Sequence, residues 1–81
     1  MTKVRAYGFG ISRKDYQKYS WEVRTARGFA GMTEHPQGYI CVFRTENDAK
    51  VCRNIMEYCG TAVGKVVFPV MVEEDNMRKE E

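Results

Sequence analysis

The three cysteines and the single histidine are the side chains of this 81-residue chain best suited to metal binding or redox chemistry. Cys52 and Cys59 are seven residues apart, about two turns or 10 Å along a helix, so they cannot bind one metal ion together. No two cysteines form a Cys-x-x-Cys pair, and three cannot all pair within one chain. This pattern is typical of buried thiols in a reducing compartment. It predicts a cytoplasmic protein with no metal and no cofactor.

The polar side chains that could act in catalysis are few and scattered. His35 precedes Pro36 in a turn-like segment, and Ser12 and Ser20 are the only serines. No pair of carboxylates stands in an apolar context, as general acid–base catalysis would require. We therefore expect a protein that is not an enzyme.

The segment from Gly60 to Lys65 superficially resembles a phosphate-binding loop. That motif requires four residues between its glycines and a helix after its lysine. Here three residues separate Gly60 from Gly64, and Lys65 begins a predicted strand. A phosphate site of this kind is therefore not expected in the segment.

Positive charge is concentrated in the first third of the chain. Residues 1–30 carry seven Lys and Arg against two acidic residues, a net charge of 7 − 2 = +5, whereas the whole chain has a net charge of +2. Aromatic side chains are interleaved with these cations, and aromatic and Arg residues are enriched at interface hot spots. The candidate binding residues, for a protein or an anion, are Arg5, Tyr7, Phe9, Trp21, Arg24, Arg27, Phe29, Met32 and Tyr39.

Residues 37–44 partly resemble the RNA-recognition motif, whose central strand reads basic-Gly-aromatic-small-aromatic-aliphatic-x-aromatic. Gly38, Tyr39 and Val42 match this pattern. The basic position, the small position and the two further aromatic positions carry other residue types. Only Tyr39 could therefore stack on a base, and the chain is not assigned to that family.

Residues 38–60 carry the clearest structural pattern in the chain. Residues 39–43 are apolar on both faces, which predicts a strand in the centre of a sheet. Thr45 and Asp48 have the spacing of a helix N-cap and its acidic partner, and Gly60 is placed to end the helix. The helical stripe predicted to face the core consists of Ala49, Cys52, Ile55, Met56 and Cys59.

The first predicted strand is Lys3–Ile11, which alternates with period two. One face carries Gly8 and Gly10, whose lack of side chains could let a helix approach closely. The other face carries Tyr7 and Phe9 between basic residues. That second face is therefore expected to be available for binding.

Two more strands are predicted from alternation, at residues 21–27 and 65–73. The last strand should lie at a sheet edge, because Pro69 cannot donate a backbone hydrogen bond. Between the first two strands, Ser12 and Asp15 predict a short helical turn over residues 13–19. Residues 28–37 are predicted to be a long loop, and residues 74–81 a frayed polar tail.

Together these elements predict one small α+β domain over residues 1–73, with the order β-β-β-α-β. Its mostly antiparallel sheet of three or four strands carries one long helix on one face. The preferred topology resembles the split βαβ, or ferredoxin-like, fold with a degenerate first helix. The alternative is a β-meander with a single helix. In both arrangements the other sheet face is partly exposed.

Two functional hypotheses from different classes follow. The first is a non-catalytic small binding protein that acts through protein–protein contacts as an inhibitor or adaptor, similar in style to those encoded by phages and other mobile elements. A homodimer is also considered, because a chain this short buries only about 60–65% of its unfolded surface. The alternative is a binder of a nucleotide, a cyclic nucleotide or single-stranded nucleic acid, through Arg and aromatic residues of the N-terminal half.

Neither hypothesis involves a membrane. No apolar run approaches the roughly 20 residues that are needed to cross a bilayer. The first residues also lack the apolar core of a signal peptide. We therefore expect no membrane partner.

Overall fold

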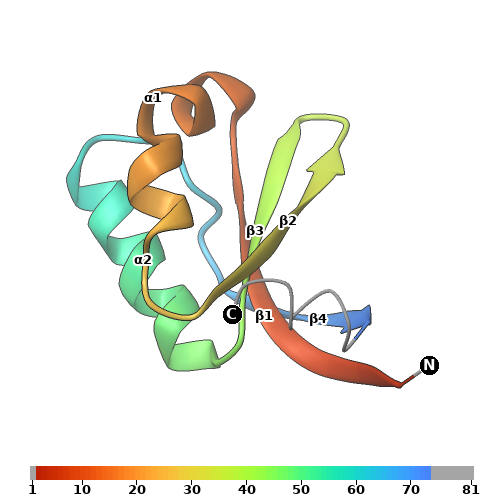
Figure 1. The fold of residues 1–81 in the computed structure, drawn as a ribbon. Helices are drawn as coiled ribbons and strands as arrows, with labels where there is room; N and C mark the ends of the chain where they lie inside the picture. Colours follow the sequence, from red (N-terminus) through yellow and green to blue (C-terminus); the bar gives the residue numbers. More distant parts are fainter. Residues whose placement is uncertain (1, 74–81) are drawn as a thin grey trace.

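The computed structural model describes residues 2–73, which form four strands and two helices (Figure 1). The elements follow one another in the order β1 (Lys3–Ile11), α1 (Arg13–Arg24), β2 (Phe29–His35), β3 (Gly38–Phe43), α2 (Glu46–Tyr58) and β4 (Phe68–Glu73). The α+β class predicted from the sequence is confirmed. The predicted polar tail, residues 74–81, lies outside the described residues.

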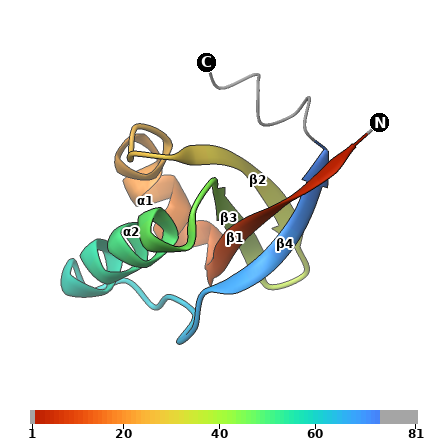
Figure 2. The ribbon, with the colours of Figure 1, turned by 90° about the horizontal axis from the view of Figure 1, so that it is seen from below.

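The four strands form one antiparallel sheet in the order β2-β3-β1-β4. Because β3 is antiparallel to both of its neighbours, β1 and β2 run parallel to each other on either side of it. By the same reasoning, β3 and β4 run parallel on either side of β1. Both helices pack on one face of the sheet (Figure 2). This is the split βαβ topology of the ferredoxin-like fold, which was the preferred prediction.

The predicted second strand, residues 21–27, is wrong, because most of it belongs to helix α1. Ser12 caps this helix by accepting a hydrogen bond from the Asp15 backbone N–H at 3.1 Å. The helix extends for 12 residues through a kink at Tyr19, so it is not degenerate. Trp21 is 74% exposed whereas Val23 is fully buried. Trp21 and Val23 are two residues apart, so they would share a face of a strand, but on a helix they point in different directions.

The predicted long loop, residues 28–37, is also wrong, because it contains strand β2. This strand pairs with β3 from Phe29 to His35, and a two-residue turn connects the two strands. A bulge lies between Phe29 and Gly31, and Gly31 has φ +150°. Gly31, one of the glycines that suggested a loop, therefore belongs to an irregular strand, because glycine adopts the unusual backbone angles of a bulge at low cost.

The predictions for β3, α2 and β4 are confirmed in their main features. β3 lies between β2 and β1, and β4 lies at the sheet edge with Pro69 in it, although β4 begins at Phe68 rather than at Lys65. Thr45 caps α2 by accepting from the Asp48 N–H at 3.1 Å. Gly60 ends the turn after α2 with φ +92°, a left-handed angle that favours glycine.

Helix α2 buries a narrower stripe than the sequence predicts. Ala49, Cys52 and Met56 lie in the core, whereas Ile55 and Cys59 are exposed. Ile55 lies at the border of the stripe, and Cys59 follows Tyr58, the last residue of the helix.

The two sheet faces differ in what covers them. Phe9 and Phe43, whose ring centroids are 5.9 Å apart, form the centre of the core under the helices. On the opposite face, Ala6, Ala30 and Val42 form a second small cluster. Among residues 2–73, no helix packs against this second face, and we call it the open face.

The prediction that a helix approaches Gly8 is wrong, because Gly8 lies on the open face. A side chain at Gly8 would meet Ile40 Cγ2 and Val70 Cγ2 rather than either helix. The larger alternating residues, Tyr7, Phe9 and Ile11, pack against the helices instead. Burial of their apolar area stabilises the fold more than burial of glycines would.

Candidate functional site

The structure places the nine predicted binding residues in different surroundings. Phe9 is fully buried in the core, so in this structure its ring cannot contact a partner, contrary to the sequence prediction. Tyr7 is half-buried and packs against the same core. The face that carries these two residues is therefore a packing surface. The remaining seven candidates lie on or near the protein surface.

Three of the candidates, Trp21, Arg24 and Phe29, line one surface hollow together with Ser20 and Thr25. This Trp21 hollow has a volume of about 390 Å³ and lies where α1 ends and β2 begins. The exposed indole of Trp21 and the half-buried ring of Phe29 supply apolar surface, and Arg24 supplies a positive charge. Such a site can hold an apolar side chain beside a carboxylate.

The Trp21 hollow is anchored by the end of helix α1. The Thr25 backbone N–H and hydroxyl both donate to the Trp21 carbonyl oxygen, at 3.0 Å and 2.7 Å. On the other side, Phe29 packs edge-to-face against the buried Phe43, with ring centroids 5.7 Å apart. The backbone of Trp21 and the ring of Phe29 are therefore held, while the indole remains exposed.

The Trp21 hollow adjoins the edge strand β2, since Phe29 belongs to both. Within the part of the chain that the structure describes, β2 pairs only with β3. The outer edge of β2 therefore presents backbone N–H and C=O groups that another extended chain could pair with. Met32, on β2, is 39% exposed and extends the apolar surface along this edge.

The other candidates do not join this hollow. Arg27 is exposed in the turn between α1 and β2. Arg5 is exposed on β1, which β3 separates from β2, and it lies opposite Met71 of β4. Arg5 is therefore held in a different part of the sheet from Arg24.

Tyr39 is half-buried beside helix α1 rather than free for stacking. Its ring packs edge-on against Tyr16, with centroids 5.1 Å apart, and the Arg13 guanidinium lies 5.5 Å from its centroid. A base that stacks on Tyr39 would have to displace one of these contacts.

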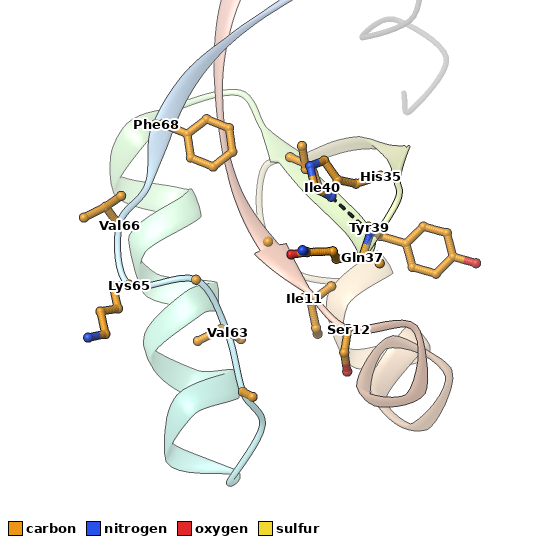
Figure 3. A pocket seen from close by; sticks show the side chains of 14 residues that line it. Ile11, Ser12, His35, Gln37, Tyr39, Ile40, Val63, Lys65, Val66 and Phe68 are labelled. Carbon is orange, nitrogen blue, oxygen red and sulfur yellow. Dashed lines mark hydrogen bonds between the residues drawn. The ribbon is translucent and has the colours of Figure 1, made fainter.

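A second cavity, which the sequence did not indicate, lies on the open face at the end of the sheet (Figure 3). We call it the sheet-end groove. It has a volume of about 470 Å³, and it is lined by residues 10–12, His35, residues 37–40, residues 62–66 and Phe68. The signal that could have indicated it is the spacing of glycines, because Gly10, Gly38 and Gly64 all lie in its lining.

The cysteines and the histidine show no arrangement for catalysis or metal binding. Among residues 2–73, no group of three or more His, Cys, Asp or Glu side chains could hold a metal ion. Burial raises the pKa of the Cys41 thiol to about 12 and that of Cys52 to about 11. Both thiols are therefore protonated at neutral pH and are weak nucleophiles.

Comparison with protein-family models, with curated proteins and with solved structures finds no match to this chain. In the described residues, neither helix is long and apolar enough to cross a membrane.

Proposed function

We propose that this protein is a non-catalytic binding module that recognises another protein through the Trp21 hollow and the edge of β2. The observation that carries the proposal is that Trp21, Arg24 and Phe29 converge on one hollow next to an edge strand. Trp and Arg are among the residues that most often dominate binding energy at interfaces. An indole that is 74% exposed gains much apolar contact when a partner covers it.

The recognition mode that fits this surface is the addition of an extended partner segment to β2. Such a segment would form backbone hydrogen bonds with the outer edge of β2 and place an apolar side chain in the Trp21 hollow. Arg24 would pair with a carboxylate of the segment. Met32 would contact the next side chain on the same strand face.

The role proposed for the module is that of an intracellular inhibitor or adaptor, of the kind that phages and mobile elements encode. A small domain without catalytic residues can block another protein, or link it to a further one, when the domain covers part of that protein's surface. A second copy of this chain could also pair along β2, and it would then form a homodimer. Both occupants are tested by the same experiment below.

A second candidate function is the binding of a nucleotide, a cyclic nucleotide or single-stranded nucleic acid at the same hollow. The observation in its favour is that an exposed indole and a guanidinium share one site, with Arg27 in the next turn. Aromatic rings stack on bases while Arg side chains contact phosphates. Arg5 lies outside this site, so the basic surface is smaller than the sequence suggested.

The deciding experiment compares wild-type protein with two alanine variants as bait in cells of the native host. Trp21→Ala removes the proposed anchor, and Tyr58→Ala removes a side chain that is 93% exposed on α2, outside the hollow. We expect one stoichiometric protein to be retained by wild type and by Tyr58→Ala and lost by Trp21→Ala. Retention by all three baits, or recovery of this chain alone, would contradict recognition of a different protein through the hollow.

The nucleic-acid alternative is separated from the first by its salt dependence. Binding to phosphates weakens steeply with ionic strength because counterions are released. Titration of mononucleotides, cyclic nucleotides and short oligonucleotides at low salt, with wild type and an Arg24→Glu, Arg27→Glu variant, tests it directly. Undetectable binding at low salt would rule this alternative out.

A further inference from the structure

The sheet-end groove has walls from three segments that are far apart in sequence. Figure 3 shows Phe68 on one side and His35 and Ile40 on the other, with the Gln37 side chain directed toward β1 between them. The floor is the end of β1 at Gly10. The groove exists only in the folded protein, because it is formed jointly by β1, the β2–β3 turn and the α2–β4 connection.

The groove wall formed by residues 62–66 is held in place through residues 62–64. The Gly64 N–H donates to the Gly10 carbonyl oxygen at 2.8 Å, and the Gly64 carbonyl accepts from Arg53 Nε at 2.6 Å. The Ala62 N–H donates to Asp15 Oδ2 at 3.2 Å, and Val63 forms a β-bridge with Ile11. A cavity whose walls are already fixed does not lose binding energy to ordering them when a ligand enters.

Glycines keep the groove open and its walls close to β1. A side chain at Gly10 would meet no atom within 4 Å, so the space above this residue is empty. At Gly38 a side chain would collide with the backbone of Ile11 and Ser12, and at Gly64 it would come within 3.3 Å of the Gly10 nitrogen. The close approach of both walls to β1 therefore depends on Gly38 and Gly64, whereas the floor at Gly10 has space for a side chain.

The lining combines apolar walls with a few hydrogen-bond donors and no acid. Its apolar side chains on the open face include Ile40 and Phe68, and none of its residues is Asp or Glu. His35 Nδ1 accepts from the Gln37 backbone N–H at 3.2 Å, which leaves Nε2–H as a donor. Lys65 lies on the rim with its ammonium turned away from the cavity, so it adds a positive field rather than a contact (Figure 3).

We infer that the sheet-end groove is a binding site for a small apolar carboxylate, such as a medium-chain or aromatic acid. The apolar body would lie against Phe68 and Ile40, and the carboxylate would accept hydrogen bonds from His35 and Gln37. The volume of about 470 Å³ falls within the range of small-molecule sites. This site is separate from the Trp21 hollow and does not depend on the proposed protein partner.

The sign of the ligand charge is tested with three eight-carbon probes that differ in their head group: octanoate, octanol and octylammonium. Binding is followed by the backbone amide NMR shifts of Gly10, Gly38 and Gly64 during titration to millimolar probe. We expect saturable shifts with octanoate and about tenfold weaker binding of octanol, because hydrogen bonds to a charged acceptor are stronger. Equal binding of octanoate and octylammonium, or no shift with octanoate, would overturn the inference.

The location of the site is tested with two leucine variants on the same sheet face. Gly10→Leu fills the empty space over the floor, whereas Thr33→Leu lies on β2 outside the lining. We expect Gly10→Leu to abolish octanoate binding while its circular dichroism and melting temperature stay close to wild type, and Thr33→Leu to bind normally. Octanoate binding by a folded Gly10→Leu protein would place the ligand elsewhere and overturn the assignment.

The role of His35 is tested with His35→Leu, which keeps an apolar wall but removes the donor. We expect this variant to bind octanoate and octanol with similar affinity. An undiminished preference for octanoate would show that His35 does not hold the carboxylate.

Discussion

Gly64 donates its backbone N–H to the carbonyl oxygen of Gly10 over 2.8 Å, which holds the α2–β4 connection alongside the end of β1. The Ile11–Val63 bridge continues this pairing by one residue. The connection therefore adds a short backbone-paired segment to the sheet before β4 begins. This pairing creates one wall of the sheet-end groove, and its stability can be measured.

Replacing Arg53 should loosen this segment. Arg53 Nε donates to the Gly64 carbonyl at 2.6 Å, and the Arg53 side chain is only 13% exposed. We expect Arg53→Met to lower the free energy of unfolding by about 1.5–3 kcal/mol, the usual range for a hydrogen bond to a charged group. Urea unfolding measures this change, and amide hydrogen exchange at residues 62–66 should become faster.

The control for Arg53 is Glu57→Gln, which removes its ion-pair partner at 3.2 Å. Glu57 is 60% exposed, and ion pairs at the surface contribute little. We expect Glu57→Gln to change stability by less than about 0.5 kcal/mol. An equal loss in both variants would assign the effect to the ion pair instead of to the bond with Gly64.

Two glycines of β1 should respond to alanine in opposite ways. At Gly10 a Cβ meets nothing within 4 Å, so Gly10→Ala should stabilise the protein by about 0.4–1 kcal/mol through lower entropy of the unfolded chain. At Gly8 a Cβ would lie 2.8 Å from the Cys41 carbonyl oxygen and 2.9 Å from Ile40 Cγ2. Gly8→Ala should therefore destabilise by about 1–3 kcal/mol, as overpacking does.

Thermal and urea unfolding of the two glycine variants measure these shifts. Both variants carry the same substitution in the same strand, so each serves as the control for the other. A stability loss of similar size at both positions would contradict the packing difference between them.

The stability of the protein should fall with rising pH in the alkaline range. Burial raises the pKa of Cys41 from 9.0 to about 12, with a further contribution from Cys52, and raises that of Cys52 from 9.0 to about 11. In the unfolded chain both thiols ionise near pH 9.0, so above it the folded state keeps protons that the unfolded state has lost. The free energy of unfolding therefore decreases from about pH 9 to 11, by up to about 1.4 kcal/mol per pH unit for each thiol.

Urea unfolding at a series of pH values measures this slope. Cys52→Ala should make the slope shallower, because it removes one of the two buried thiols. The same burial predicts that a thiol reagent modifies Cys59 in the native protein and reaches Cys41 and Cys52 only after unfolding. An unchanged slope in Cys52→Ala would show that this thiol is not desolvated in the fold.

The proposed interface makes a quantitative prediction for a purified partner. We expect Trp21→Ala to weaken binding by about 2 kcal/mol or more, roughly thirtyfold, as truncation of a hot-spot residue does. Because the Trp21 side chain is largely exposed, the melting temperature should stay near that of wild type. Calorimetric titration measures the affinity, and Tyr58→Ala should match wild type. Full affinity in Trp21→Ala would exclude the hollow as the anchor site.

Features that are encoded over short stretches could be predicted from the sequence. Residues 38–60 specify a buried strand, a Thr45 cap, a helix and a terminating glycine, because each signal depends on neighbours within about one helical turn. The edge position of β4 follows from Pro69, which lacks a donor whatever the tertiary structure.

Residues 21–35 could not be predicted in this way. The alternation of Trp21 and Val23 suits a strand locally, but Val23 gains more by packing as part of a helix against Cys41 and Phe43. Likewise, β2 forms despite Gly31 because β3 supplies partners for its backbone groups. Core packing and strand pairing override weak local propensity.

The amino-acid sequence alone therefore determined the fold class and supplied the aromatic and Arg side chains of the N-terminal half. Only the tertiary structure decided which of these residues meet. It buried Phe9, brought Trp21, Arg24 and Phe29 together, and placed Gly10 beside Gly64 across more than 50 residues of chain. The physical reason is that the sheet-end groove is lined by segments that are remote in sequence, and that residues 20–29 line the Trp21 hollow only because residues 21–24 are helical instead of forming the predicted strand.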